Sequence, residues 1–215
     1  MRHLILAIAL LTLAPAAALA AGDRGFQLEV DAVGSLPSGT YEFGDRAGDL
    51  FDYGGNAFGR ALFGLSRGLY VGAAVGYLQN HKDFTRTSLL DTRPSFPVSG
   101  TRTMHAIPVL GIIQVRSDTH HRLSWYGEGG LGVTTFDRRL TNLAFGSFAL
   151  PPQAVFQQGL SFLVGGGTCL GLGRNLDLLV GTSYLQSFTH RGPAWESGDN
   201  PAYVLGSIGV RYPRW

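Results

Sequence analysis

The stretch WYGEGGLGVTTF, residues 125–136, decides between two folds. Its core, GEGGLG, fits the G-x-G-x-x-G pattern that binds a dinucleotide pyrophosphate, but that pattern is meaningful only between a strand and a helix. Here Trp125 and Leu131 share one face while Glu128 and Phe136 share the other, as in a β-strand. No helical pattern follows the glycines. We therefore interpret the stretch as a glycine-containing strand and not as a nucleotide site.

The same two-residue period recurs along the chain. Leu28 and Val30, for example, alternate with Glu29 and Asp31. The period predicts eight strands, near residues 25–34, 56–65, 69–78, 102–116, 124–137, 156–170, 175–188 and 202–212. Several have the length, roughly 9–11 residues, that a tilted strand needs to cross a bilayer.

The predicted connections alternate in length. Those near residues 66–68, 117–123 and 171–174 are short, and those near 35–55, 79–101, 138–155 and 189–201 are long. A soluble sandwich has no reason to keep that order, whereas outer-membrane barrels have short periplasmic turns and longer extracellular loops. The sequence therefore predicts an all-β fold, an eight-stranded antiparallel up-and-down transmembrane β-barrel with short periplasmic turns and four long extracellular loops.

The alternative all-β fold is a soluble, secreted barrel of the lipocalin kind, which would turn its apolar faces inward. The apolar set Leu160, Phe162 and Val164 faces away from Gln157 and Ser161. An apolar face on the outside suits lipid, and aromatic residues near strand ends suit the girdles at the two membrane interfaces.

The N-terminus resembles a secretory signal. Arg2 and His3 precede a ten-residue apolar run at residues 4–13, and Ala18 and Ala20 offer small residues to the peptidase. We expect residues 1–20 to be cleaved and residues 21–215 to form one barrel domain in the outer membrane of a Gram-negative bacterium.

The composition narrows the classes of function. The 17 basic residues nearly balance the 15 acidic ones, so no net field recruits nucleic acid. The single cysteine, Cys169, excludes an intrachain disulfide. Glycine is abundant, with 31 residues, and we expect Gly130 and Gly132 to relieve crowding in a narrow barrel interior.

Three segments and the predicted signal carry a resemblance to the small OmpA/OmpW-type outer-membrane β-barrel superfamily. The segments are HAIPVLGIIQV (105–115), WYGEGGLGV (125–133) and GSIGVRYPRW (206–215). The resemblance implies that the barrel-assembly machinery recognises the C-terminal end, with Tyr212 and Trp215 as the assembly signal, although Pro213 departs from the usual pattern. It also implies contact with outer-membrane lipids and lipopolysaccharide. Such families include structural anchors, adhesins and narrow channels for hydrophobic molecules.

Charged residues on the polar faces predict a charge network inside the barrel. With the apolar faces toward lipid, the residues that project inward are Glu29, Asp31, Arg60, Glu128 and Arg211. Opposite charges in a narrow interior would pair, because an unpaired buried charge is heavily penalised. The network is interpreted as a polar core that fills the barrel, with an internal gate or proton-conducting plug as the alternative. Both argue against a wide pore.

An enzymatic alternative is a hydrolase similar to the lipid A deacylases. Ser187, His190 and Glu196 lie near one another in the sequence, but Gly192 stands where that family carries its serine. We therefore expect no enzyme and no cofactor. The favoured function is a structural or surface-interaction barrel, with a narrow channel for small hydrophobic solutes as the alternative.

The long loops are the predicted surface for an extracellular ligand. The first is acidic and aromatic, with Asp45, Asp49 and Asp52, and the last carries Trp195. The acidic spacing lacks the order of a calcium loop, so we interpret it as a solvated surface without a metal. The sequence names no ligand, solute or oligomeric state.

Overall fold

The computed structural model describes residues 25–40, 52–87, 97–117, 122–145, 147–173, 176–189 and 200–213. The predicted signal, residues 1–20, lies outside the described residues. The predicted domain, residues 21–215, is described only in part. The strands are β1 (Phe26–Thr40), β2 (Gly54–Ser66), β3 (Leu69–Thr87), β4 (Pro97–Arg116), β5 (Leu123–Phe145), β6 (Phe148–Ala149), β7 (Gln153–Gly171), β8 (Asp177–Thr189) and β9 (Asn200–Pro213). No helix in the described part of the chain is long and apolar enough to cross a membrane.

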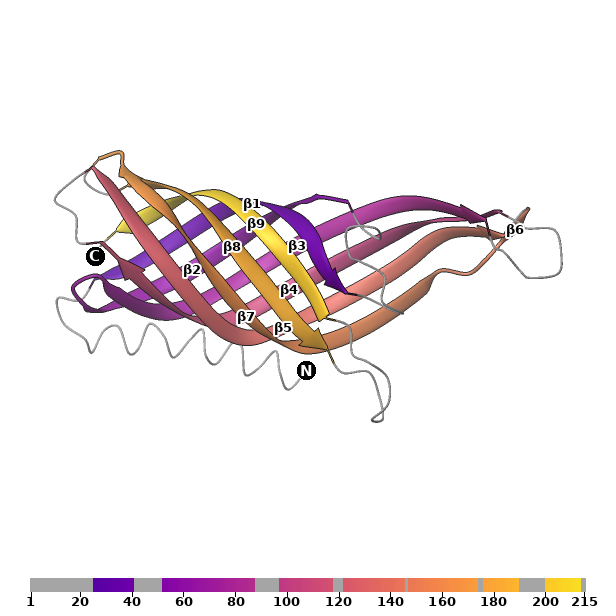
Figure 1. Cartoon of the computed structure of the whole chain (residues 1–215), viewed down its shortest axis with the longest axis horizontal. Helices are drawn as coiled ribbons and strands as arrows, with labels where there is room; N and C mark the ends of the chain where they lie inside the picture. Colours follow the sequence, from indigo (N-terminus) through magenta and orange to yellow (C-terminus); the bar gives the residue numbers. More distant parts are fainter. Residues whose placement is uncertain are drawn as a thin grey trace.

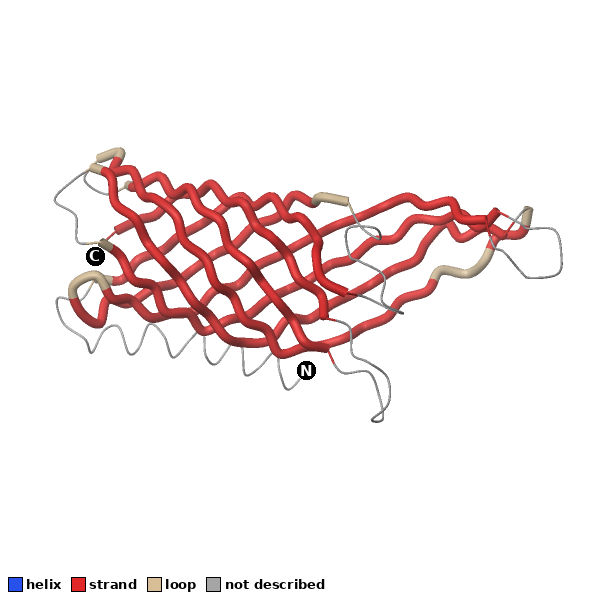
Figure 2. The backbone as a smooth tube through the Cα atoms, viewed as in Figure 1, coloured by secondary structure: helices blue, strands red, loops and turns tan. Residues whose placement is uncertain are grey.

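The eight long strands close into an antiparallel up-and-down barrel (Figure 1), as the sequence predicts. Each pairs with its neighbour in the chain, and β1 pairs with β9 to close the ring. Followed once around the barrel, the register that starts at Leu28 returns to β1 at Ser38, ten residues further on (38 − 28). That stagger tilts the strands against the barrel axis, which Figure 2 shows as a crossing mesh.

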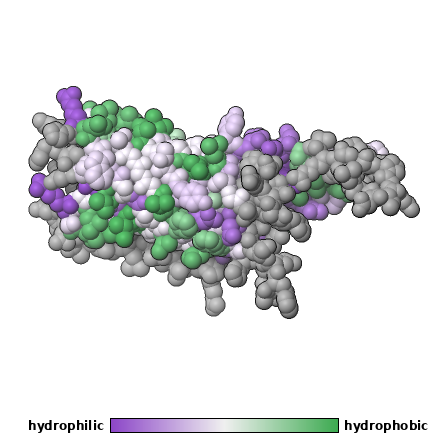
Figure 3. All heavy atoms as spheres, viewed as in Figure 1, coloured by the Kyte–Doolittle hydropathy of each residue, from purple (hydrophilic) through white to green (hydrophobic). Residues whose placement is uncertain are grey.

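The predicted alternation of faces is present on every long strand. Outward apolar side chains are well exposed and include Leu28, Val30, Ile113, Val115, Leu131, Val133, Leu160, Val164, Val180, Ile208 and Val210. In Figure 3 the barrel body shows mostly green and near-white atoms, and purple ones gather at its left end and where the longer strands leave it. An apolar belt of this kind belongs against lipid and not against water.

The connections differ between the two ends of the barrel. At the turn end, β2 passes to β3 through Arg67–Gly68, and Gly68 has the left-handed φ of 77° that glycine adopts without strain. The other connections at that end span residues 117–122 and 172–176. At the opposite, loop end the connections span 41–53, 88–96, 146–152 and 190–199.

Parts of the predicted long loops are strands, which corrects the predicted boundaries. β3 continues to Thr87, β4 starts at Pro97, β5 continues to Phe145 and β7 starts at Gln153. These four strands run past β1, β2, β8 and β9 as a one-sided extension, on the right in Figures 1 and 2. The prediction stopped early because these ends are polar and lack the apolar alternation, although their backbones stay paired.

The ladder between β3 and β4 has a gap inside the barrel wall. Val75 pairs with Val109 and Leu78 with Ala106, but the two pairs between them are absent. Pro108 lies at the gap, and proline has no N–H to donate to a neighbouring strand. The register is the same on both sides, so the wall is weakened there without being displaced.

The glycines of residues 125–136 lie within β5, but the reason expected for Gly132 is incomplete. A Cβ added to Gly132 would lie 2.1 Å from the carbonyl oxygen of Val109 on β4. The obstacle is thus the neighbouring backbone, not a crowded lumen. At Gly130 the nearest atom is a side-chain methyl of Ile112, at 2.8 Å, as lumen crowding requires.

Candidate functional site: the charged interior

Six strands supply charged side chains to one layer inside the barrel, near its turn end. The register places Glu29 on β1 directly opposite both Arg60 on β2 and Arg211 on β9. Glu128 on β5 lies opposite Gln114 on β4, and Asp177 on β8 lies opposite Arg211. Because alternate residues of each strand point into the barrel and neighbouring strands are paired in register, charges that are far apart in sequence lie close together.

Arg60 bridges two carboxylates across the interior. Its Nη1 donates to Asp31, and its Nη2 lies 2.9 Å from Glu128 Oε1. The side chains of Asp31 and Glu128 are each only 2% exposed. Each carboxylate thus depends on protein partners, and mainly on this guanidinium, because it is almost wholly removed from solvent.

Arg116 holds a third carboxylate, that of Glu29. Its Nη2 lies 2.7 Å from Glu29 Oε1, and its guanidinium stacks 4.1 Å from the centre of the Tyr70 ring. Gln114 Nε2 lies 3.5 Å from Glu29 Oε2 and 3.4 Å from Glu128 Oε2. The neutral amide therefore connects the two carboxylates, and Gln27 accepts a further hydrogen bond from Arg116.

Arg211 closes the layer at the turn end. It donates twice to Asp177 Oδ2, from Nε at 2.9 Å and from Nη2 at 2.6 Å. Its Nη1 lies 3.8 Å from Glu29 Oε1 and has no hydrogen-bond partner among the described residues. Asp177 is 18% exposed, so the layer meets solvent on this side.

The buried part of the layer is balanced in charge. Three guanidinium groups face the three carboxylates of Glu29, Asp31 and Glu128, and the partly exposed Asp177 adds a fourth carboxylate at the rim. The charged residues expected inside the barrel lie together here. Gln27 and Gln114 were not predicted to belong to this layer, because they carry no charge. Each lies two residues from a predicted or observed charged residue, Glu29 and Arg116, and therefore on the same inward face of its strand.

Comparison with known proteins finds a similar fold but no sequence family. No family model matches the chain, and no curated protein matches it. Among solved structures, Neisserial surface protein A is similar with a TM-score of 0.55 and 17% identity over 87% of this chain and 96% of that one. The chain has the fold of a small eight-stranded outer-membrane β-barrel.

Two further outer-membrane barrels are similar at a lower level. The outer membrane protein OprG from Pseudomonas aeruginosa has a TM-score of 0.45 and 14% identity over 88% of this chain and 95% of that one. Ail, the attachment invasion locus protein of Yersinia pestis, has a TM-score of 0.45 and 16% identity over 87% and 99%. The assignment of fold rests on the Neisserial protein alone.

An apolar layer fills this outer-membrane barrel fold above the charges. On β1 the inward residues change from Glu29 and Asp31 to Val33 and then to Ser35. One connected cluster of buried residues contains Val33, Phe58, Leu62, Ala74, Leu78, Met104, Ala106, Leu110, Ile112, Phe136, Leu163, Leu185, Tyr203 and Leu205. None is more than 5% exposed, so solvent enters the middle of the barrel from neither end.

Three inward hydroxyl groups hydrogen-bond to one another in the loop-end half of the barrel. Ser161 Oγ lies 2.7 Å from both Thr134 Oγ1 and Ser187 Oγ. Ser187, the nucleophile of the hydrolase alternative, is therefore buried in hydrogen bonds to other hydroxyls. His190, Gly192 and Glu196 lie outside the described residues.

The outer surface becomes polar just above the apolar belt. Tyr77 Oη lies 2.7 Å from His105 Nδ1, and Arg139 Nη2 lies 2.6 Å from Asp137 Oδ2. The hydrogen bond from Arg139 lowers the pKa of the Asp137 carboxyl. These side chains mark the height at which an interface with polar headgroups can begin.

The remaining predicted residues are only partly described. Tyr212 is outward and 60% exposed near the end of β9, while Trp215 lies outside the described residues. Asp52 is exposed, and Lys82 Nζ lies 3.4 Å from its Oδ1. Asp45, Asp49 and Trp195 also lie outside the described residues. Within the described segments, no group of three His, Cys, Asp or Glu side chains could hold a metal ion.

Proposed function

We propose that the chain is an integral outer-membrane protein with a structural or surface-interaction role, and not a wide pore. The observation that carries the proposal is the inaccessible interior, where side chains such as Leu110, Leu185 and Leu205 are at most 1% exposed. The apolar outer belt and the expected signal at residues 1–20 support insertion from the periplasm. In that orientation the turn end is periplasmic and the loop end, with the extension, is extracellular.

The proposed partners follow from this placement. Outer-membrane lipids and lipopolysaccharide would cover the belt, and the barrel-assembly machinery would recognise Tyr212 and Trp215. An extracellular ligand would meet the loops, where Asp45, Asp49, Asp52 and Trp195 are the candidate surface. Recovery of the protein in the soluble periplasm without detergent would contradict this placement.

Planar-bilayer conductance tests the closed interior. We expect the refolded protein to give no large, steady current steps. Glu29→Gln and Arg60→Gln each loosen the charge layer, so we expect a lower folded fraction or a raised conductance. The exposed control Tyr53→Gln should change neither, because Tyr53 is 77% exposed. Large steps from the unmodified protein would contradict a closed barrel, and unchanged behaviour of both interior variants would mean that the charge layer is not needed to fold or close it.

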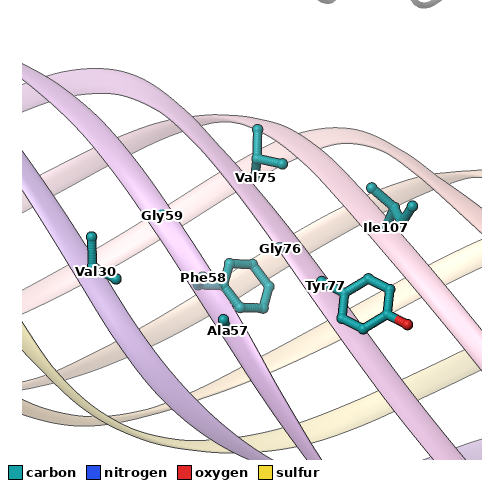
Figure 4. A pocket seen from close by; sticks show the side chains of 8 residues that line it. All are labelled: Val30, Ala57, Phe58, Gly59, Val75, Gly76, Tyr77 and Ile107. Atoms are coloured by element: carbon teal, nitrogen blue, oxygen red, sulfur yellow. The ribbon is translucent and has the colours of Figure 1, made fainter.

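A second candidate function is the passage of small hydrophobic solutes through the wall. The observation that favours it is an apolar hollow of about 370 Å³ on the outer face at the β3–β4 gap (Figure 4). Val75, Tyr77 and Ile107 line it beside Phe58, whose side chain belongs to the interior cluster. The hollow therefore lies over the interruption of the ladder, directly outside a residue of the interior cluster.

Entry of a small apolar fluorophore into proteoliposomes tests this candidate. If the wall admits solutes at the gap, Pro108→Val restores an N–H donor and should slow entry, while Val133→Leu on the intact β5 belt should not. Entry no faster than into protein-free liposomes would remove the candidate.

A further inference from the structure

The gap in the β3–β4 ladder leaves one backbone carbonyl without a strand partner. Pro108 pairs with Thr134 in an uninterrupted ladder to β5, so the backbone nitrogen of Pro108 faces β3 and not β5. The two pairs absent on the β3 side are the ones that need a hydrogen bond from this nitrogen to Gly76 O, and proline has no N–H to donate. The ladder therefore offers Gly76 O no donor, and no other described group donates to it.

This carbonyl lies beside the apolar hollow in the outer wall. Gly76 lines the hollow together with Val75, Tyr77 and Ile107 (Figure 4), and it does so with its backbone because it has no side chain. Each contributing strand is paired on both of its sides, so the hollow is a feature of the wall and not of a loop. An unpaired backbone group is costly in hydrocarbon, because no water is present to hydrogen-bond to it. The hollow thus combines an apolar surface with one acceptor that needs a donor.

The loop-end rim of the hollow is polar. Tyr77 Oη lies 2.7 Å from His105 Nδ1 and 3.3 Å from Gln79 Oε1, at the height where polar headgroups can begin. An amphiphile with its head at this rim would direct its chain down the hollow toward the middle of the apolar belt. Gly76 directly precedes Tyr77, so the acceptor lies within about 3 Å along the strand from the rim. The donor that it needs therefore belongs near the head of the chain.

We propose that the hollow binds one acyl chain of an outer-leaflet lipid, and that this chain carries a hydroxyl group near its head, which donates to Gly76 O. The headgroup lies beside Tyr77 and His105, and the rest of the chain covers Val75 and Val30. A chain without the hydroxyl group fills the apolar part equally well but leaves the carbonyl unpaired. The proposal rests on the proposed outer-membrane placement and goes beyond the structural role, because it assigns one kind of lipid to one place on the wall.

Two other occupants make different predictions. A passing solute of the second candidate function needs only apolar contact, so a hydroxyl group does not improve its binding. A second copy of the barrel brings apolar side chains and a fully paired backbone to the hollow, and it has no donor to spare for Gly76 O. A preference for the hydroxyl group therefore separates the lipid from both.

The test uses the full refolded protein in detergent micelles and two lysophosphatidylethanolamines, whose myristoyl chains differ only in a hydroxyl group on the third carbon. Both lipids are offered together in equal amounts, and native mass spectrometry measures the ratio in which they are bound. One net hydrogen bond predicts a preference of about 2- to 10-fold for the hydroxylated lipid. Equal binding of the two lipids, or binding of neither, would overturn the proposal.

Pro108→Ala tests the acceptor. Alanine restores an N–H donor for Gly76 O, so the preference for the hydroxylated lipid should disappear while the two lipids still bind. The variant should fold, because it completes the ladder between β3 and β4. A preference that survives in Pro108→Ala would show that the hydroxyl group is recognised elsewhere, and the assignment to Gly76 would be wrong.

Gly59→Phe tests the place. Gly59 lines the hollow and an added Cβ meets nothing within 4 Å, so the variant should fold while its ring fills the hollow and abolishes the preference. Gly129→Phe is the control, at an outward glycine of β5 where the nearest atom to an added Cβ is 4.0 Å away, and should leave the preference unchanged.

Heat-modifiable migration confirms that each variant is folded. Conductance and membrane fractionation are measured separately, so failure of the closed barrel or of its placement is distinguishable from failure of the lipid site. A preference retained by Gly59→Phe, or lost equally in Gly129→Phe, would overturn the proposal. Self-association that Gly59→Phe prevents would also overturn it, because a second copy would then be the occupant.

Discussion

Two glycines of β5, three residues apart, face different constraints. Gly132 lies against the β4 backbone, where an added Cβ would be 2.1 Å from Val109 O. Gly129 faces outward, and the nearest atom to an added Cβ is Leu163 O at 4.0 Å. The alternation predicts which glycines face inward, but the close approach of β4 depends on twist and register that a single strand does not encode.

This contrast gives a prediction within one strand. Gly132→Val should block assembly of the barrel, because β4 cannot move away without breaking its pairing with β5. Gly129→Val adds a side chain in open space and should leave the folded fraction unchanged. The folded fraction is measured by heat-modifiable migration. Equal folding of the two variants would show that β4 can yield at Gly132.

At the scale of the strands, the sequence predicts where a strand lies and which of its side chains face inward better than it predicts where the strand ends. All eight predicted segments are strands, because apolar residues every second position record burial against lipid. The loop-end limits of β3, β4 and β5 are not predictable in this way. Above the apolar belt these strands are polar, so their backbones stay paired although their sequences lack the apolar alternation. The charge layer was predictable as inward residues, but its partners follow only from the register between strands.

A shortened β5–β7 hairpin tests whether the extension is needed for folding. Leu140 and Gln153 are directly paired, so an Asn-Gly turn in place of residues 141–152 can join them. We expect unchanged barrel assembly, because all the removed residues lie beyond the apolar belt. Deletion of Leu131 and Gly132 within the belt is the control and should prevent folding by shifting the register of β5. A hairpin variant that fails to fold would mean that the extension nucleates the barrel.

At the scale of the whole molecule, the interior charges affect stability strongly only because they are buried and paired. Arg60→Met leaves Asp31 and Glu128 without their shared partner and should lower the free energy of unfolding by about 3–5 kcal/mol. Arg139→Met is the control, since that side chain is 57% exposed, and should have no measurable effect. Urea unfolding in lipid vesicles measures both. Equal stabilities would show that water reaches the layer.

The pairing of Glu29 with Arg211 joins the first strand of the barrel to the last. The smallest slip at this seam that keeps inward side chains inward is two residues, which would bring Glu29 opposite Gly209 or Pro213. A barrel closed in the wrong register would then lose the contact between Glu29 and Arg211 and divide the charge layer at the seam, with Glu29 and Arg116 on one side and Arg211 and Asp177 on the other. The charge layer therefore favours the correct register between β1 and β9 when the last strand pairs with the first and closes the barrel.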